Sequence, residues 1–298
     1  GAANFNAGSA NDITLNNPAN NFSSVSVSSA NNVTLDDTSA LTLAASTISG
    51  NLIATTGGDI TDSGTISVAG ITTLSAAGHD ITLDDNNDFN SLGITAAKNA
   101  SINDINALVL NACSITGTLT VSTKGDITQS APVSVTAGSS FNAGSTNSIA
   151  LNNPANNFFS VSVSSANNVT INDADAIVLA VSTISGTLTV NTNGDITQAG
   201  VLSVKFASQF NAGGANNIIF NNPNNDFSSV SISSANNVTL NDTNALALGA
   251  CAVSGTLTVG TNGDIIQTGI LAITGISTFN AGSTNNITLN NPANNFSS

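Results

Sequence analysis

Aspartate is the residue type here with the clearest capacity for chemistry, because the chain has seventeen acidic residues and all of them are Asp. One series follows glycine in a Gly-Asp-Ile motif, and a second ends runs such as TLDD and IND. The first series is Asp59, Asp126, Asp195 and Asp264, and the second is Asp37, Asp104, Asp173 and Asp242. Recurring carboxylates suggest Ca²⁺, which takes six to eight convergent oxygen ligands.

The spacing of each series argues against a shared ion. Members of one series lie one repeat apart, about 14 Å if three stacked strands separate them. The glycine-rich GGxGxD nonapeptide that binds Ca²⁺ in other β-rolls is absent. We therefore expect the Asp residues to shape turns. Weak Ca²⁺ binding, which requires the two series to meet, stays the alternative.

The other ionisable residues are departures from a repeated pattern. They are His79, Lys98, Lys124 and Lys205, each in a slot that other repeats fill with a small residue. Nucleophilic catalysis needs a base beside the nucleophile, and the single His has no unusual neighbour in sequence. Polysaccharide-cleaving β-helices need clustered carboxylates, often with a basic residue, but Arg and Glu are absent. We therefore predict no enzyme, with no catalytic, metal or cofactor-binding residues.

The two cysteines occupy one repeat position. Cys113 and Cys251 stand where other repeats have Ser46 and Ser182. A disulfide needs Cα atoms less than about 7 Å apart, which stacked repeats do not offer to residues two units apart. We predict two small buried side chains that are interchangeable with serine.

A phrase of about twenty residues recurs along the chain. FNAGSANDITLNNPANNFSS begins at Phe5, and related phrases begin at Leu74, Phe141, Phe210 and Phe279. Successive phrases start about 67–69 residues apart, and such a fixed period is typical of repeat architectures. The repeats are therefore 5–73, 74–140, 141–209 and 210–278, with a partial repeat at 279–298. We expect residues 1–298 to be one continuous solenoid segment of a longer array.

Short strands separated by sharp turns must position these residues. VSVSS at 25–29 and LTVST at 119–123 alternate apolar with polar residues, which predicts strands with one buried face. TNGD, SANN and NNPANN provide turn residues between them. The pattern predicts an all-β parallel β-helix, a β-solenoid, with about three coils of about 23 residues per ~69-residue repeat and about thirteen coils in all. Four shorter coils per repeat stay the alternative.

Aromatic and amide side chains recur at fixed positions. Two Phe series comprise Phe5, Phe141, Phe210 and Phe279, and Phe22, Phe89, Phe158, Phe227 and Phe296. We expect them to pack in the core rather than to form a ligand-binding platform. The Asn pairs 16/17, 152/153, 221/222 and 290/291 are expected to stack as amide ladders.

Charge excludes some partners. The formal net charge is −14 with three basic residues, so neither nucleic acid nor an anionic membrane surface is an expected partner. No apolar run approaches the roughly 18–20 residues of a spanning helix, so no membrane insertion is expected, and no signal peptide is present.

The phrases DITLNN, NNFSSVSVSSANNVTL, ALTLAASTISGNL, GTLTVSTKGDITQ and STFNAGSTNNITL resemble the shaft repeats of filamentous haemagglutinin-like giant adhesins. These are two-partner-secretion exoproteins of Gram-negative bacteria. The resemblance covers essentially the whole chain. It implies a right-handed parallel β-helix, export through an outer-membrane transporter partner, and a secreted filament at the bacterial cell surface. It carries over no binding residue.

Repetition and resemblance together predict a structural shaft of an extracellular filamentous adhesin or surface fibre, which gives reach and rigidity without catalysis. Its partners would be a host or neighbouring cell surface, or the protein itself. One alternative is a self-assembling fibre subunit that associates end to end or laterally. Another is a solenoid binding module for carbohydrate or ice, ranked lower because outward Thr alternates with Ser, Ala and Asn.

Overall fold

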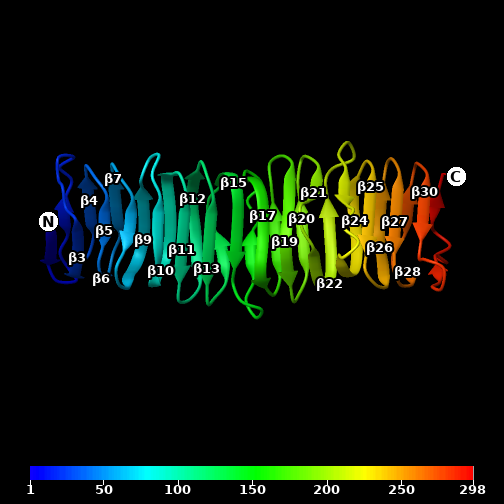
Figure 1. Ribbon diagram of the computed structural model, residues 1–298, viewed down its shortest axis with the longest axis horizontal. Helices are drawn as coiled ribbons and strands as arrows, with labels where there is room; N and C mark the ends of the chain where they lie inside the picture. The colour runs from blue at the N-terminus through cyan, green and yellow to red at the C-terminus, as the bar shows by residue number, and fades with distance from the viewer. Residues whose placement is uncertain (298) are drawn as a thin grey trace. The chain divides into compact units, whose positions relative to one another are not determined.

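The computed structural model describes residues 1–297, and these residues form strands and turns without any helix. They divide into two compact units, residues 1–147 and the residues from Ser148 onward. In each unit, parallel strands stack turn upon turn as a β-solenoid, with the strands shown as arrows in Figure 1. The all-β, parallel β-helix prediction is therefore confirmed.

The strands are short, most of them three to ten residues long. The first unit contains β1 (Ala2–Asn6), β2 (Ile13–Leu15), β3 (Ser24–Ser29), β4 (Val33–Asp37), β5 (Leu41–Leu43), β6 (Ser46–Ile48), β7 (Leu52–Thr56), β8 (Ile60–Asp62), β9 (Ile66–Ser75), β10 (Ile81–Ala97), β11 (Ala100–Asp104), β12 (Leu108–Ile115), β13 (Leu119–Thr123), β14 (Ile127–Gln129) and β15 (Val133–Asn142). The second contains β16 (Ile149–Leu151), β17 (Asn157–Ala166), β18 (Val169–Asn172), β19 (Ile177–Ile184), β20 (Leu188–Asn191), β21 (Ile196–Gln198), β22 (Leu202–Asn211), β23 (Ile218–Phe220), β24 (Asp226–Ala235), β25 (Val238–Asp242), β26 (Leu246–Val253), β27 (Leu257–Thr261), β28 (Ile265–Gln267), β29 (Leu271–Ile273), β30 (Ser277–Asn280), β31 (Ile287–Thr288) and β32 (Asn295–Phe296).

One ladder of paired residues measures the turn length in the first unit. It runs through Ala2, Ser24, Thr42, Thr61, Thr82, Ser101, Thr120 and Ser140, each paired in parallel with the next. Seven steps lead from Ala2 to Ser140, so one turn takes about 20 residues, at the short end of the units that solenoid proteins stack. In the second unit, a ladder from Ile149 to Gln267 takes six steps, again with about 20 residues in each.

The turns are thus shorter than the expected length of about 23 residues, and they number about 15 rather than thirteen. A ~69-residue repeat spans about three and a half turns, between the two divisions that the sequence left open. Tight corners account for the difference. At the corner beside Gly125, an added Cβ would lie 2.5 Å from the backbone nitrogen of Ala107, so only glycine permits such close stacking.

The half turn places equivalent residues of successive repeats on different walls. Phe5 pairs with Val27, whereas its repeat equivalent Leu74 pairs with Ala54 and Ile94. The row of paired residues that contains Leu74 also contains Ala54, Leu35 and Leu15. Leu15 follows Phe5 by ten residues, which is half a turn, so this row lies on another wall than Phe5. Side chains that recur once in each repeat therefore do not line up in a single row along the first unit.

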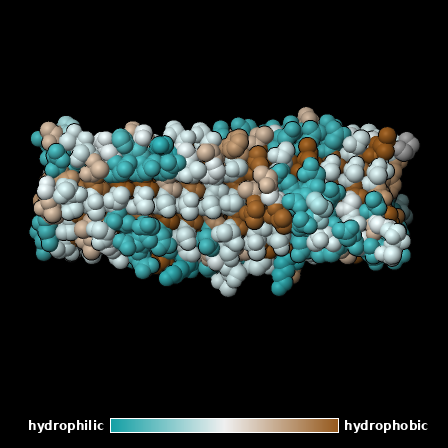
Figure 2. Space-filling model, in the orientation of Figure 1, coloured by the Kyte–Doolittle hydropathy of each residue, from teal (hydrophilic) through white to brown (hydrophobic). Residues whose placement is uncertain are grey.

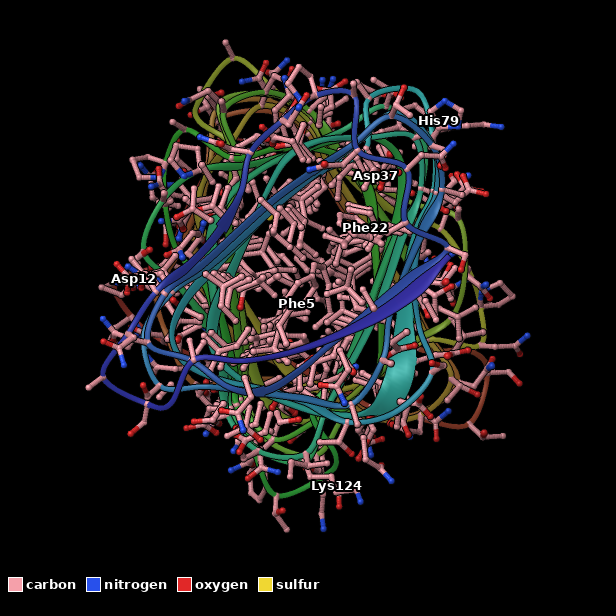
Figure 3. All side chains as sticks on the ribbon, turned by 90° about the vertical axis from the view of Figure 1, so that its left-hand side faces the viewer. Phe5, Asp12, Phe22, Asp37, His79 and Lys124 are labelled. Atoms are coloured by element: carbon pink, nitrogen blue, oxygen red, sulfur yellow. The ribbon has the colours of Figure 1, made fainter. Side chains whose placement is uncertain are left out.

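The interior is filled by aliphatic side chains and phenylalanine. The fully buried rings are those of Phe89, Phe141, Phe158, Phe210, Phe220 and Phe227. In the first turn, Phe5 and Phe22 point into the interior, with ring centroids 6.2 Å apart in an edge-on arrangement (Figure 3). The expectation that both Phe series pack in the core is confirmed for these rings, while Phe296, in the last strand, is 39% exposed.

The residue two positions before each ring of the first Phe series is small. Ser208 precedes Phe210 and Ser277 precedes Phe279, whereas the bulkier Thr72 precedes the smaller Leu74. Thr72 and Ser208 are fully buried between the apolar neighbours of their ladders, where their hydroxyl groups have no hydrogen-bond partner. A larger ring is therefore accompanied by a smaller neighbour, so the combined side-chain volume of the two positions is roughly conserved. The cost is a buried hydroxyl group without a partner.

This arrangement makes Ser208→Ala a stabilising substitution. It removes an unsatisfied buried hydroxyl while leaving the space that Phe210 needs, so we expect the free energy of unfolding to rise by about 1 kcal/mol. Urea unfolding would measure the change, and Ser208→Val, which adds volume beside the ring, is the overpacked control. A loss of stability in Ser208→Ala would show instead that the hydroxyl is satisfied in solution.

Candidate functional site

The aspartates of the second series link one turn to the turn before it. Asp104, fully buried at the end of β11, accepts the backbone N–H of Phe89 through Oδ2 (2.7 Å) and that of Asn106 through Oδ1 (2.9 Å). The first bond spans 15 residues and the second spans two. Each carboxylate therefore closes its own corner and also holds the strand below, a contact we call the aspartate staple.

The staple recurs in each of the four full repeats. Asp37 holds Phe22 and Ser39, Asp173 holds Phe158 and Asp175, and Asp242 holds Phe227 and Asn244. Figure 3 shows Asp37 beside Phe22 at one corner of the first unit. The expectation that these Asp residues shape turns is confirmed, and the bond to the preceding turn is a feature that the sequence did not indicate.

Burial makes three of the staple carboxyls, those of Asp104, Asp173 and Asp242, weaker acids. Desolvation raises the pKa of Asp104 and Asp242 above the ordinary value for Asp, and it raises the pKa of Asp173 to about 6. The backbone N–H groups that each carboxylate accepts act in the opposite direction, because they favour the ionised form. Desolvation is the larger effect at all three positions.

These pKa shifts predict that stability falls as the pH rises. A carboxyl whose pKa is higher in the folded state binds its proton more tightly there than in the unfolded state. Its contribution to the free energy of unfolding is therefore complete below about pH 4 and is lost as the pH rises through about 6. For Asp173 alone, we expect the free energy of unfolding to decrease by about 1 kcal/mol between pH 4 and 7, after allowing for solvent screening. Urea unfolding at several pH values, with Asp173→Asn as the non-titrating control, would measure it.

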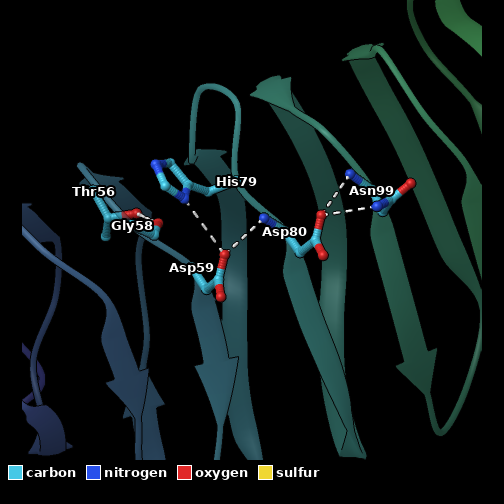
Figure 4. Close-up of polar contacts among 6 residues, drawn as sticks. All are labelled: Thr56, Gly58, Asp59, His79, Asp80 and Asn99. Atoms are coloured by element: carbon cyan, nitrogen blue, oxygen red, sulfur yellow. Dashed lines mark hydrogen bonds and ion pairs between the residues drawn. The ribbon is translucent and has the colours of Figure 1, made fainter.

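The first Asp series caps a different corner by receiving backbone N–H groups from the next turn. Asp59 Oδ1 accepts the N–H of Asp80 at 3.0 Å, and Asp80 Oδ1 in turn accepts the N–H and side-chain amide of Asn99 (Figure 4). In the second unit, Asp195 and Asp264 accept the N–H of the residue 22 positions on. These carboxylates are corner caps, as predicted.

A polar ladder along the corners does form, although from other residues than the Asn pairs expected. Asn51 donates its backbone N–H to Asn32 Oδ1, and Asn32 donates to Asp12 Oδ1. The second Asn of each predicted pair instead accepts the N–H two residues on and so closes the proline-containing loop. These residues are Asn17, Asn153, Asn222 and Asn291.

The basic residues that depart from the repeated pattern lie in different surroundings. His79 Nδ1 lies 3.6 Å from Asp59 Oδ1 with both side chains about half exposed, a contact drawn in Figure 4. Lys124 points outward at a corner of the first unit, where its carbonyl accepts Asn147 Nδ2 (Figure 3). The ammonium group of Lys205 lies 6.0 Å from the centre of the Phe206 ring. Within residues 1–297, no three His, Cys or Asp side chains are grouped so that they could hold a metal ion.

The cysteines behave as predicted from their serine equivalents. Both are free and buried, and the sulfur of Cys113 lies 3.4 Å from the carbonyl oxygen of Asn111. Ser46 makes the same bond to the carbonyl two residues before it, and its Oγ accepts the N–H of Val27. Burial raises the pKa of both thiols to about 11, so they are poor nucleophiles at neutral pH.

Several shallow grooves indent the walls, and no sequence pattern indicated them. One of 590 Å³ in the second unit contains Lys205, and one of 250 Å³ in the first unit contains Asp88 and Asn106. A third of 440 Å³ is lined mostly by Ala and Ser side chains of β24, β26 and β29. Elsewhere, Figure 2 shows a surface mainly of hydrophilic and intermediate residues, with hydrophobic residues in narrow stripes and small clusters.

Comparison with known proteins places the whole pattern in one family. A family model described as repeats of unknown function (DUF5649) matches residues 1–29, 30–96, 97–164, 166–234 and 235–298. The last four matches begin about 67–69 residues apart, which is the same period as that of the phrase beginning with Phe or Leu. No curated protein and no solved structure matches the chain. None of the described residues forms a helix that is long and apolar enough to cross a membrane.

Proposed function

Because the chain belongs to the family of repeats of unknown function DUF5649, and its repeats stack as a β-solenoid, we propose that it serves as a structural shaft. The shaft would belong to an extracellular filamentous adhesin or surface fibre and would act without catalysis. The turn-to-turn bonding of the corners is the observation that carries this proposal. Within each unit, backbone ladders join successive turns, and at corners such as those of Asp59, Asp104 and Asp242 a side chain also bonds to the next or the preceding turn.

Repetition suits a spacer because each turn is stabilised mainly by its neighbours. The aspartate staple, the corner caps and the buried rings all recur with the repeat, so an added repeat brings its own contacts. In such arrays, stability is approximately a sum of repeat and neighbour-interface energies. Duplication therefore lengthens the molecule without requiring a new core.

The chemistry of the side chains also favours a passive role. Many of the aspartates, the ionisable residues that occur most often, are engaged in backbone hydrogen bonds at corners. The two cysteines are buried, and the single histidine contacts a half-exposed aspartate. These contacts use the reactive groups for structure.

The extracellular location rests on the resemblance of the repeats to filamentous haemagglutinin-like shafts. That resemblance implies secretion through an outer-membrane transporter and exposure at the bacterial surface. Protease treatment of intact cells that carry the native gene, followed by immunoblotting against this chain, tests it. We expect loss of the signal from intact cells while a cytoplasmic marker persists, and retention of both signals contradicts the location.

The mechanical part of the proposal is tested separately with the purified chain. Stretching single molecules should show a series of unfolding events at high force, because many turns must be unzipped in succession. A variant that lacks one staple, Asp104→Ala, should lower the force of the events in that region and leave the others unchanged. A single low-force extension without discrete events would contradict a load-bearing shaft.

A further inference from the structure

The 590 Å³ groove in the second unit has the character of a binding site. Its lining includes Thr183, Ser185, Ser203, Lys205, Asp226 and Asn244, which provide hydroxyl, ammonium, carboxylate and amide groups. We call it the Lys205 groove. It lies on one wall across successive turns, with β22 between β19 and β24. Its volume lies within the range of 300–1,000 Å³, roughly, that ligand sites in proteins occupy.

Lys205 gives this groove a cation in a chain that has only three. Within residues 1–297, the one ion pair shorter than 4.0 Å is that of His79 and Asp59, so Lys205 has no carboxylate partner at this distance. Next to it in the chain, the Phe206 ring is 55% exposed although large apolar side chains are usually buried. Lys205 thus lines the groove, and the exposed Phe206 ring lies beside its ammonium group, 6.0 Å away, next to the lining residues.

The first unit contains a matched groove without these two groups. Its 250 Å³ are lined by residues that include Ser67, Ala69, Asp88 and Asn106, the repeat equivalents of Ser203, Lys205, Asp226 and Asn244. The same amide-to-carboxylate bond crosses both grooves, at 2.7 Å in the first unit and 2.9 Å in the second. The repeat therefore provides the bonded Asp and Asn side chains in both grooves. Lys205 and its neighbour Phe206 occur only in the second unit, and the first unit has Ala69 and Gly70 at the same positions.

We propose that the Lys205 groove binds an acidic saccharide, a chain of sugar rings that carries carboxylate groups. The ammonium group of Lys205 pairs with the sugar carboxylate, and the ring of Phe206 packs against the apolar face of a pyranose. The serine and threonine hydroxyls, the Asn244 amide and the Asp226 carboxylate exchange hydrogen bonds with sugar hydroxyls. A neutral sugar lacks the first contact, and a simple anion lacks the second and third.

Titration of the purified chain with tri-galacturonic acid, followed by calorimetry or by NMR, tests this inference. Lys205→Ala should weaken binding about tenfold, since it removes a charge-assisted contact. Phe206→Gly should weaken it by a similar factor, and the double variant recreates the wall of the first-unit groove. Both side chains lie on the surface, so these variants should fold normally, which their unfolding curves would verify.

A second experiment transfers the lysine to the groove of the first unit. Introducing Ala69→Lys into the double variant should restore part of the binding in the first unit, because it rebuilds the charge-assisted contact. Gly70 is kept, since a Cβ there would lie 2.4 Å from the backbone oxygen of Gly50. Methyl-esterified tri-galacturonate, which has the same rings without the charge, should bind at least tenfold more weakly than the acid. Equal binding of the ester, equal binding of a tri-aspartate peptide, or unchanged affinity in Lys205→Ala would each overturn the proposal. Failure here leaves the shaft function untouched, because that function is tested by force and location.

Discussion

Replacing Asp104 with alanine is expected to lower the free energy of unfolding by about 3 kcal/mol, although the substitution removes only a small polar side chain. The carboxylate accepts two backbone N–H groups, and that of Phe89 lies in the fully buried interior. Alanine offers no acceptor at that position. A buried donor left without a partner costs about 1–3 kcal/mol, and the N–H of Phe89 becomes such a donor, whereas that of the exposed Asn106 can turn to water.

The staple must be separated from the general loss of a negative charge. Asp104→Asn keeps one acceptor oxygen but turns an amide N–H toward the second donor, so we expect a loss between those of the wild type and Asp104→Ala. Asp88→Asn removes a charge of the same unit whose carboxylate accepts side-chain bonds only, and it should change stability by less than about 1 kcal/mol. Hydrogen exchange should report faster exchange of the Phe89 amide in Asp104→Ala. Unchanged protection of that amide would contradict the staple.

The sequence predicted the strands and their interior faces because alternation of apolar and polar residues has a direct physical cause. VSVSS places Val25 and Val27 inside and the serines toward solvent, as the structure confirms. The equivalence of Cys113 with Ser46 was also predictable, since a small side chain recurs there. Turn length was not, because alternation specifies faces and not how many residues a corner needs.

The staple and the grooves depend on neighbours in space that no local pattern encodes. Asp104 and Phe89 are 15 residues apart along the chain, and this separation has meaning only once the turn length is known. A comparison of the repeats identified Lys205 as a departure, whereas its groove also requires Thr183 and Asn244 from other turns. The sequence therefore indicated which residue to inspect, and the stacking of turns supplied its surroundings.

Replacing Phe227 with alanine is expected to lower the free energy of unfolding by about 3–5 kcal/mol, the largest effect of any substitution considered. The ring is fully buried, and its centre lies 6.2 Å from that of Phe210 and 5.8 Å from that of Phe220. Deleting it loses both ring contacts and leaves a cavity, which the hydrogen-bonded turns above and below cannot easily close. Urea unfolding of the purified variant would measure the loss.

Two variants and one spatial observation make the Phe227 prediction specific. Phe227→Leu retains most of the volume and should cost less than about 1.5 kcal/mol. Phe159→Ala removes a ring that is 61% exposed and should be nearly neutral. Because each turn depends chiefly on its neighbours, the loss of hydrogen-exchange protection in Phe227→Ala should centre on β24 and on β22 and β26, which pair with it on either side. It should leave the ladder from Ala2 to Ser140 protected. A uniform loss of protection across residues 1–147 would show that the solenoid unfolds as one cooperative body and that stability is not a local sum of turns.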